Sequence, residues 1–139
     1  MKRYGKLWHQ VISFENLLLA FQKASKGKRS RHEVSCFALN RESELLLLQN
    51  ELRMGKYRPG KYREFTIYER KPRKISAAPF RDRVVHHALM NVVEPLLDKC
   101  FINDSYACRK NKGVHRAVRK YQKWANQYSY ALKLDIARK

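Results

Sequence analysis

Residues 79–98 read PFRDRVVHHALMNVVEPLLD and carry the strongest periodic pattern in the chain. Apolar pairs recur in it every four positions: Val84-Val85, Ala88-Leu89, Val92-Val93 and Leu96-Leu97. This spacing predicts a helix over 80–98 with a broad buried stripe. Pro95 is expected to bend or end the last turn, because proline has no N–H to donate to the helical ladder. The core is therefore expected to form around this helix.

Two more helices are expected on the N-terminal side. Apolar residues recur at three- and four-residue steps over 7–23, which predicts one helix there. Three leucines share a face over 41–54, which predicts another. Residues 24–40 break the pattern and contain a basic loop, KGKRSR. Its Lys28 and Arg29 are candidate phosphate contacts, and a merely solvated loop is the alternative.

The pattern changes from helical to alternating after the turn signal YRPG at 57–60. Residues 61–70 are rich in β-branched and aromatic types, which predicts a strand. A shorter strand is expected over 75–79, so that the two form a hairpin. The tip of this hairpin is strongly basic, because four cations lie within five positions: Arg70, Lys71, Arg73 and Lys74.

The C-terminal part predicts a loop over 99–111, a helix over 112–128 and a strand over 130–136. Eight Lys or Arg and no acid lie between Asp104 and Asp135, so we expect an anionic partner to offset their repulsion. The basic face of the helix holds Lys112, Arg116, Arg119, Lys120 and Lys123. The predicted fold class is therefore α+β, rich in helix and with one basic hairpin.

The composition also points to a polyanionic partner. The 139-residue chain holds 31 Lys and Arg against 12 Asp and Glu, a formal net charge of +19. Nucleic acid is the commonest ligand of such a polycation, and an anionic membrane surface is the second. The longest aliphatic run, Leu45 to Leu48, is far too short to span a bilayer, and no signal-peptide core is present. We expect a cytoplasmic protein, for which three cysteines without a C-x-x-C pair are typical.

Four blocks, from about residue 40 onward, resemble the fingers region and first catalytic strand of bacterial reverse transcriptases. This group includes the enzymes of group II introns, retrons and diversity-generating retroelements. The blocks are YRP at 57–59, PFRDRVVHHAL with EPLL and Phe101 at 79–101, DSYACR with KGVHRA at 104–117, and YALKLDI at 130–136. They are similar to the family patterns R-D-R-V-V-x-x-A-L, S-Y-G-F-R-x-x-x-x-x-H-x-A and Y-x-x-x-x-D-I.

The resemblance implies helical fingers that lead into the first strand of a palm sheet. It implies an N-terminal helical extension with the basic loop over 1–40, the fingers region over 41–128 and the first palm strand over 129–139. The family continues with an aromatic pair and a Y-x-D-D hairpin that bears the other catalytic carboxylates, and this sequence contains neither. The remainder of a polymerase chain is therefore an expected partner.

The resemblance also assigns roles to single residues. Asp135 matches the family's metal-binding catalytic aspartate, and the Ile136 carbonyl would assist it in holding Mg²⁺ in the complete enzyme. Nucleotidyl transfer uses two ions about 3.5–4 Å apart, which a lone aspartate cannot hold. The residues implied to contact incoming dNTP are Lys71, Arg73, Lys74 and Arg63. Those implied to contact RNA template or RNA/DNA duplex are Arg109, Arg116, Arg119, Lys120 and Lys123, with Lys28 and Arg29.

Three alternatives stay open. The chain could be a stand-alone basic RNA-binding protein derived from a truncated reverse transcriptase, with a retroelement RNA as its ligand. It could bind anionic lipid through its amphipathic N-terminal helix, although that helix lacks a dense basic row. A zinc site at Cys100, Cys108 and His115 lacks the short ligand spacing of structural zinc.

Asp82 is expected to stabilise the N-terminus of the helix over 80–98, with Arg83 as an ion-pair partner.

Overall fold

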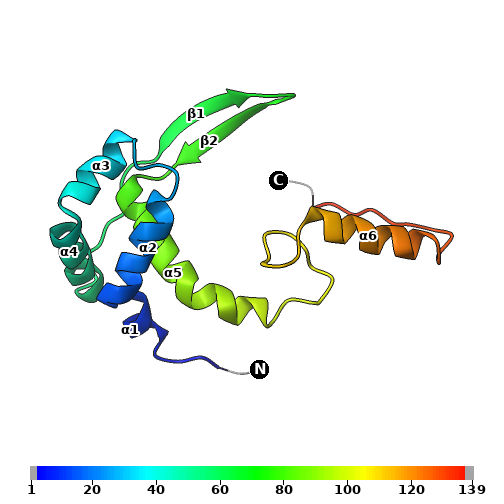
Figure 1. The fold of residues 1–139 in the computed structure, drawn as a ribbon, viewed down its shortest axis with the longest axis horizontal. Coiled ribbons are helices and arrows are strands. Elements are labelled where there is room, and N and C mark those ends of the chain that lie inside the picture. Colours follow the sequence, from blue (N-terminus) through cyan, green and yellow to red (C-terminus); the bar gives the residue numbers. More distant parts are fainter. Residues whose placement is uncertain (1–2, 137–139) are drawn as a thin grey trace. The chain divides into compact units, whose positions relative to one another are not determined.

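The computed structural model describes residues 3–136 and divides into two compact units, the first ending at Leu96 and the second beginning at Leu97 (Figure 1). The described residues form six helices and one two-stranded antiparallel sheet, which confirms the α+β class. No helix among them is long and apolar enough to cross a membrane. The elements are α1 (Leu7–Val11), α2 (Phe14–Ser25), α3 (His32–Leu39), α4 (Arg41–Arg53), β1 (Arg63–Tyr68), β2 (Pro72–Ala77), α5 (Phe80–Asp98) and α6 (Val114–Ala125).

The single helix predicted over 7–23 is wrong, because the chain breaks between α1 and α2. Ser13 takes an extended conformation and its hydroxyl accepts the Asn16 N–H at 3.2 Å, as the N-cap of α2. The break frees backbone carbonyls, and side chains satisfy them. Asn16 donates to the Val11 carbonyl at 2.9 Å, and Gln49 from α4 donates to the Ile12 carbonyl at 2.8 Å.

Residues 24–40 break the apolar pattern of the sequence, yet their second half forms a helix, α3. Only Val34 and Phe37 of α3 are buried, so its pattern is a single three-residue step. The helix is stabilised by tertiary packing rather than by a repeating apolar face. Phe37 stacks on Phe21 of α2 with ring centroids 5.6 Å apart and meets Phe80 of α5 edge-on at 5.3 Å.

These three rings lie in the one hydrophobic core described for the first unit. The first five helices all contribute to it, and α4 supplies Leu45, Leu48 and Leu52, as the leucine pattern predicts. The helix over 80–98 is confirmed, and α5 continues past Pro95 to Asp98. Its apolar stripe is only partly buried: Val84 and Ala88 are in the core, whereas Leu89 is 44% exposed.

The predicted hairpin is confirmed, with β1 and β2 joined by the turn Glu69–Lys71 (Figure 1). Arg63 pairs with Ala77 at its base and Tyr68 with Pro72 at its tip. The second strand begins at Pro72, earlier than the predicted 75, so that Arg73 and Lys74 are strand residues. Every residue of β1 is exposed, and β2 is at most half-buried, so the hairpin extends from the core rather than covering it.

Asp82 in the first turn of α5 fastens the base of the hairpin. Its carboxylate is 2% exposed and accepts the Tyr57 hydroxyl at 2.5 Å and the Gly60 N–H at 2.8 Å. A Cβ on Gly60 would lie 2.9 Å from the Pro79 ring, so the close approach needs glycine. Arg83 pairs with Glu33 rather than with Asp82, which corrects the expected ion pair.

The second unit holds the predicted irregular loop, which extends over 99–113 rather than 99–111, and the predicted helix, α6, which is shorter than 112–128 at both ends. The strand predicted over 130–136 is wrong for this structure. These residues form no strand, and Tyr130 and Ile136 are 95% and 94% exposed. A strand needs a neighbour to bond its backbone groups, and the part of the chain that is described offers none. Residues 137–139 of the predicted palm segment lie outside the described residues.

Candidate nucleic-acid interface

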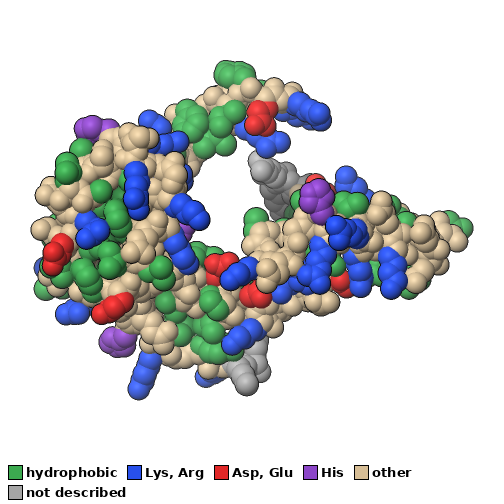
Figure 2. All heavy atoms as spheres, viewed as in Figure 1, with side chains coloured by type: hydrophobic (Ala, Val, Ile, Leu, Met, Phe, Trp, Pro, Cys, Tyr) green, Lys and Arg blue, Asp and Glu red, His purple; other side chains and the backbone are tan. Residues whose placement is uncertain are grey.

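Lysine and arginine side chains gather along α6 and around the tip of the hairpin (blue in Figure 2). The predicted nucleotide contacts of the hairpin do not meet at one point. Lys71 lies in the turn. Arg73 and Lys74 are consecutive residues of β2, so the side chains of these two lie on opposite faces of the hairpin. Arg63 lies on the same face of the hairpin as Arg73, because Arg73 pairs with Ile67, and Ile67 and Arg63 share one side of β1. Arg63 is nevertheless at the base of the hairpin, whereas Arg73 is near its tip.

Arg63 instead joins a second group of cations at the base of the hairpin. It lines a pocket of about 150 Å³ together with Arg31, Lys61 and Arg83, and with one acid, Glu33. Three of these cations were not among the candidates from the sequence. Arg31 precedes α3 and Arg83 lies in α5, so no local pattern could join them. The excess of Lys and Arg in the whole chain was the one signal that pointed to further cationic sites.

The basic loop places Lys28 close to α5, where it acts on His87. Burial lowers the pKa of the His87 imidazole below its ordinary value of 6.5, and the charges of Lys23 and Lys28 lower it further. Arg29 is exposed and has no hydrogen-bond or ion-pair partner among the described residues. The loop therefore presents Lys26, Arg29 and Arg31 to solvent, whereas Lys28 is half-buried and acts on the helix.

The four predicted cations of α6 form one continuous row. Arg116, Arg119, Lys120 and Lys123 are spaced by three, one and three positions, as on one face of a helix. A second pocket, of about 280 Å³, lies beside this row and is lined by three of its cations, by Lys112, and by Asp104. Asp104 is the one acid that pairs with the row among the described residues, at 3.7 Å from Lys120. Arg119 and Lys123 pair with none of them.

The other side of α6 carries apolar side chains that are largely exposed, and Trp124 lies at the edge of the cationic row. None of its residues is buried, and Val118, Tyr121 and Trp124 are 46%, 59% and 40% exposed. Aromatic rings therefore stand next to the cationic row, and the Lys120 ammonium lies 4.9 Å from the centre of the Trp124 ring. Cations beside exposed rings are the chemistry with which proteins hold single-stranded nucleic acid.

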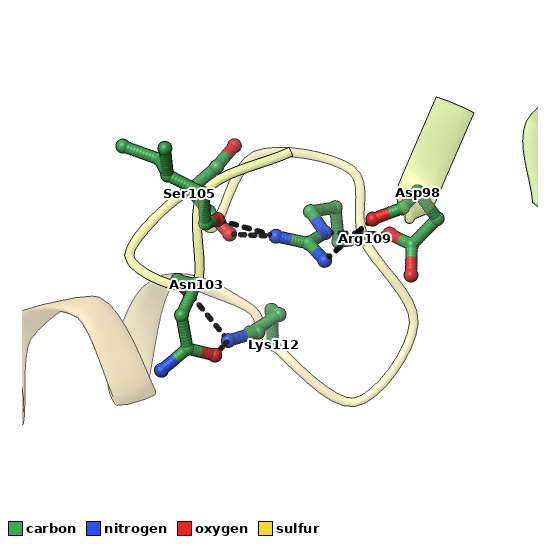
Figure 3. A network of polar contacts seen from close by, with 6 residues as sticks. Asp98, Asn103, Ser105, Arg109 and Lys112 are labelled. Carbon is green, nitrogen blue, oxygen red and sulfur yellow. Dashed lines mark hydrogen bonds and ion pairs between the residues drawn. The ribbon is translucent and has the colours of Figure 1, made fainter. Parts of the chain in front are cut away.

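Arg109 has its partners in its own loop and at Asp98, the last residue of α5 (Figure 3). Its Nε donates to the Asp98 carboxylate at 2.6 Å, and its Nη1 donates to the Ile102 and Ser105 carbonyls at 2.9 and 3.2 Å. The hydrogen bond from Arg109 holds the pKa of Asp98 below its ordinary value. Lys112 likewise donates to the carbonyl and side-chain oxygens of Asn103. Arg109 organises the loop, and its contact with template stays a prediction.

Asp135 has no second carboxylate beside it in the described structure. No group of three His, Cys, Asp or Glu side chains that could hold a metal ion occurs among residues 3–136. A lone exposed aspartate does not fit a two-ion site. Cys100, Cys108 and His115 form no such group within the same range, and Cys36, Cys100 and Cys108 are exposed and form no disulfide among the described residues.

Fold and surface together define a small basic α+β protein with cationic pockets in each of its two units. No protein-family model matches the chain. Over 78 residues, 55% of its length, the chain is 35% identical to protein YkfC of Escherichia coli (strain K12). The matched region covers 20% of YkfC, so the chain corresponds to a small part of that relative.

Proposed function

We propose that this chain binds nucleic acid as the N-terminal fingers portion of an RNA-directed DNA polymerase. The observation that carries nucleic-acid binding is the row of α6, in which Arg119 and Lys123 have no acidic partner among the described residues. Such cations position a phosphate backbone without reading its sequence. RNA template and RNA/DNA duplex are the proposed ligands, because the four sequence blocks resemble those of reverse transcriptases.

The structure gives a physical reason for two of these blocks, which supports the polymerase proposal. Tyr57 belongs to the first block, Gly60 follows it, and Asp82 belongs to the second, and hydrogen bonds join them at the hairpin base. The hairpin that they fasten carries Lys71, Arg73 and Lys74, the proposed contacts of incoming dNTP. Asp135 would need further carboxylates from the remainder of a polymerase chain before it could hold Mg²⁺. We therefore expect no primer extension by this chain alone.

A stand-alone RNA-binding protein is the second candidate, and the charge of +19 favours it equally. It would bind RNA through the same row but would have no use for dNTP. A cytoplasmic location suits both candidates.

RNA binding is tested by measuring affinity for a single-stranded RNA at several salt concentrations. We expect the affinity to fall steeply with salt, because bound cations release counterions from the phosphates. Arg119→Gln with Lys123→Gln should weaken binding and flatten the dependence of log K on log salt by about 0.7 for each phosphate that is no longer neutralised. Arg41→Gln with Arg53→Gln is the matched control, since both arginines are exposed on α4. Equal effects of the two pairs would contradict the proposed interface.

The two candidates are separated by dNTP. If the chain is a polymerase part, Mg²⁺–dNTP should bind and Lys71→Gln with Arg73→Gln should abolish that binding while RNA affinity remains. A stand-alone RNA-binding protein should show no dNTP binding at any concentration of Mg²⁺. Primer extension by the isolated chain would refute the statement that it lacks catalytic activity.

A further inference from the structure

The pocket at the base of the hairpin holds an excess of positive charge. Its cations come from three places in the chain: Arg31 before α3, Lys61 and Arg63 just before and at the start of β1, and Arg83 in α5. Glu33 is the one acid among the residues that line it. Four cations against one carboxylate leave a local charge of three, which attracts an anion from solution.

Arg83 is held in place in this pocket by its contacts with Glu33 and Phe80, but one of its hydrogen-bond donors has no acceptor among the described residues. Its Nη2 donates to the Glu33 carboxylate at 3.1 Å, and its guanidinium lies 5.4 Å from the centre of the Phe80 ring. Its Nε is buried and has no hydrogen-bond partner among the described residues. A buried donor without an acceptor is unfavourable, so an acceptor oxygen of a ligand that reaches this Nε would stabilise the site.

The other cations of the pocket are free to turn toward a ligand. Arg31 and Lys61 are exposed and have no ion-pair or hydrogen-bond partner for their side chains among the described residues. Arg63 is also exposed, and its guanidinium lies 5.6 Å from the centre of the Phe65 ring. Guanidinium groups bind phosphate with two parallel hydrogen bonds, which favours a phosphate ligand at this site.

The size of the pocket limits the ligand. Its volume of about 150 Å³ is well below the roughly 300–1,000 Å³ of pockets that enclose whole small molecules. A single phosphate group suits this space better than a nucleoside triphosphate does. The end of β2 and the two residues before α5 offer no platform for a base in the pocket, because Ala77, Ala78 and Pro79 line it there.

We propose that this pocket binds one backbone phosphate of a single-stranded nucleic acid, and that Glu33 holds Arg83 until the phosphate displaces it. This inference rests on the proposed nucleic-acid binding for the source of the phosphate, but it assigns a different site from the row on α6. Glu33 takes the place of the phosphate on Arg83 in the free protein, so the pocket is preformed. Because Glu33 and the phosphate compete for Arg83, the affinity of the pocket for phosphate is reduced.

The first test removes the free cations and leaves the Glu33–Arg83 pair intact. The triple variant Arg31→Gln, Lys61→Gln and Arg63→Gln should lower the affinity for an RNA of about 20 nucleotides and flatten its salt dependence by about 0.7. All three side chains are exposed, so the fold should survive, and thermal unfolding checks this. The control removes three exposed cations away from the pocket: Arg41→Gln, Arg53→Gln and Lys56→Gln.

The second test removes the internal competitor. Glu33→Gln should raise RNA affinity several-fold more than Glu42→Gln, which makes the same charge change on an exposed residue of α4. The excess should vanish when Glu33→Gln is combined with the triple variant. Equal effects of the two glutamate variants would show that Glu33 competes with nothing.

The outcomes separate this inference from the proposed function. If the wild-type chain binds RNA and the triple variant matches its control, the pocket proposal is overturned and RNA binding through α6 stands. If the wild-type chain binds no RNA, inorganic phosphate is titrated in its place. Phosphate binding that the triple variant abolishes would then support a phosphate pocket whose ligand is a free anion, and absent binding would overturn the pocket as well.

Discussion

Asp82 is the residue on which the geometry of the hairpin depends most directly. It is a buried carboxylate with two donors, one from a side chain and one from the backbone. Burial raises the pKa of the Tyr57 hydroxyl, and its hydrogen bond to Asp82 raises it further, so this hydroxyl remains a donor throughout the working pH range. The neighbouring Arg81 pairs with Glu51 of α4 at 2.8 Å, which fixes the same turn from the other side.

Tyr57→Phe should lower the free energy of unfolding by about 1.5–3 kcal/mol, because it removes the hydrogen bond to the buried carboxylate of Asp82. The phenylalanine ring keeps the packing of the tyrosine ring, so the change tests the hydroxyl alone. Denaturant unfolding measures this change. Tyr68→Phe is the control, since Tyr68 is 82% exposed on the hairpin, and it should leave stability unchanged. A Tyr57 variant as stable as the control would mean that water replaces the missing donor.

His87 should make stability depend on pH. Its folded-state pKa is lowered by burial and by Lys23, Lys28, His86 and Arg83, so the unfolded chain binds a proton more readily. The free energy of unfolding should therefore fall as the pH drops below about 6.5, and His87→Gln should remove that part of the slope. His115→Gln, at an exposed position of α6, is the control. An unchanged slope in the His87 variant would assign the effect to other groups.

At the scale of single elements, the loop over 99–113 is ordered by Arg109 rather than by a core. Arg109→Lys keeps the charge but loses the planar set of donors that reaches Asp98, Ile102 and Ser105 together. Amide hydrogen exchange across the loop should become faster, while the salt dependence of RNA binding should stay the same. Lys110→Gln, at an exposed position, should change neither the loop nor its exchange. A flatter salt dependence in Arg109→Lys would instead assign Arg109 to the ligand.

The sequence predicted those elements whose pattern is long or repeated. The apolar doublets of α5 and the leucines of α4 were sufficient to predict two helices. The alternation of residue types in β1 was sufficient to predict a strand. It did not predict the break at Ser13, because Phe14 and Leu18 continue the apolar steps across it and the compensating donor, Gln49, comes from another helix. It did not predict α3, whose two buried residues make no period.

The sequence was sufficient to predict that the candidate site is cationic, but it located only some of the residues that form it. Charge and spacing identified the α6 row, because helical periodicity alone puts its members on one face. The pocket at the hairpin base depends on residues 31 and 83 meeting in space, which follows from packing rather than from any local pattern. The alternation over 130–136 predicted a strand, yet a strand depends on a neighbour, and residues 130–136 have none in the described structure.

At the scale of the whole molecule, the net charge of +19 opposes folding through self-repulsion. Four ion pairs occur among residues 3–136, formed by Arg81, Arg83, Arg109 and Lys120, so repulsion outweighs pairing. The melting temperature should therefore rise when salt is raised from low to physiological concentration, because the ions then screen repulsion between charges that are more than about 8–10 Å apart. A melting temperature that falls with salt would show that the four pairs dominate instead.

The position of Lys120 over Trp124 gives the second unit an optical signal of its own. The chain has two tryptophans, and the other, Trp8, belongs to the first unit. A phosphate that draws the Lys120 ammonium off the ring changes the electric field at the indole and shifts its emission. In a Trp8→Phe chain, fluorescence would therefore report occupancy of the α6 row alone, and a ligand held only at the hairpin base would leave the spectrum as it was.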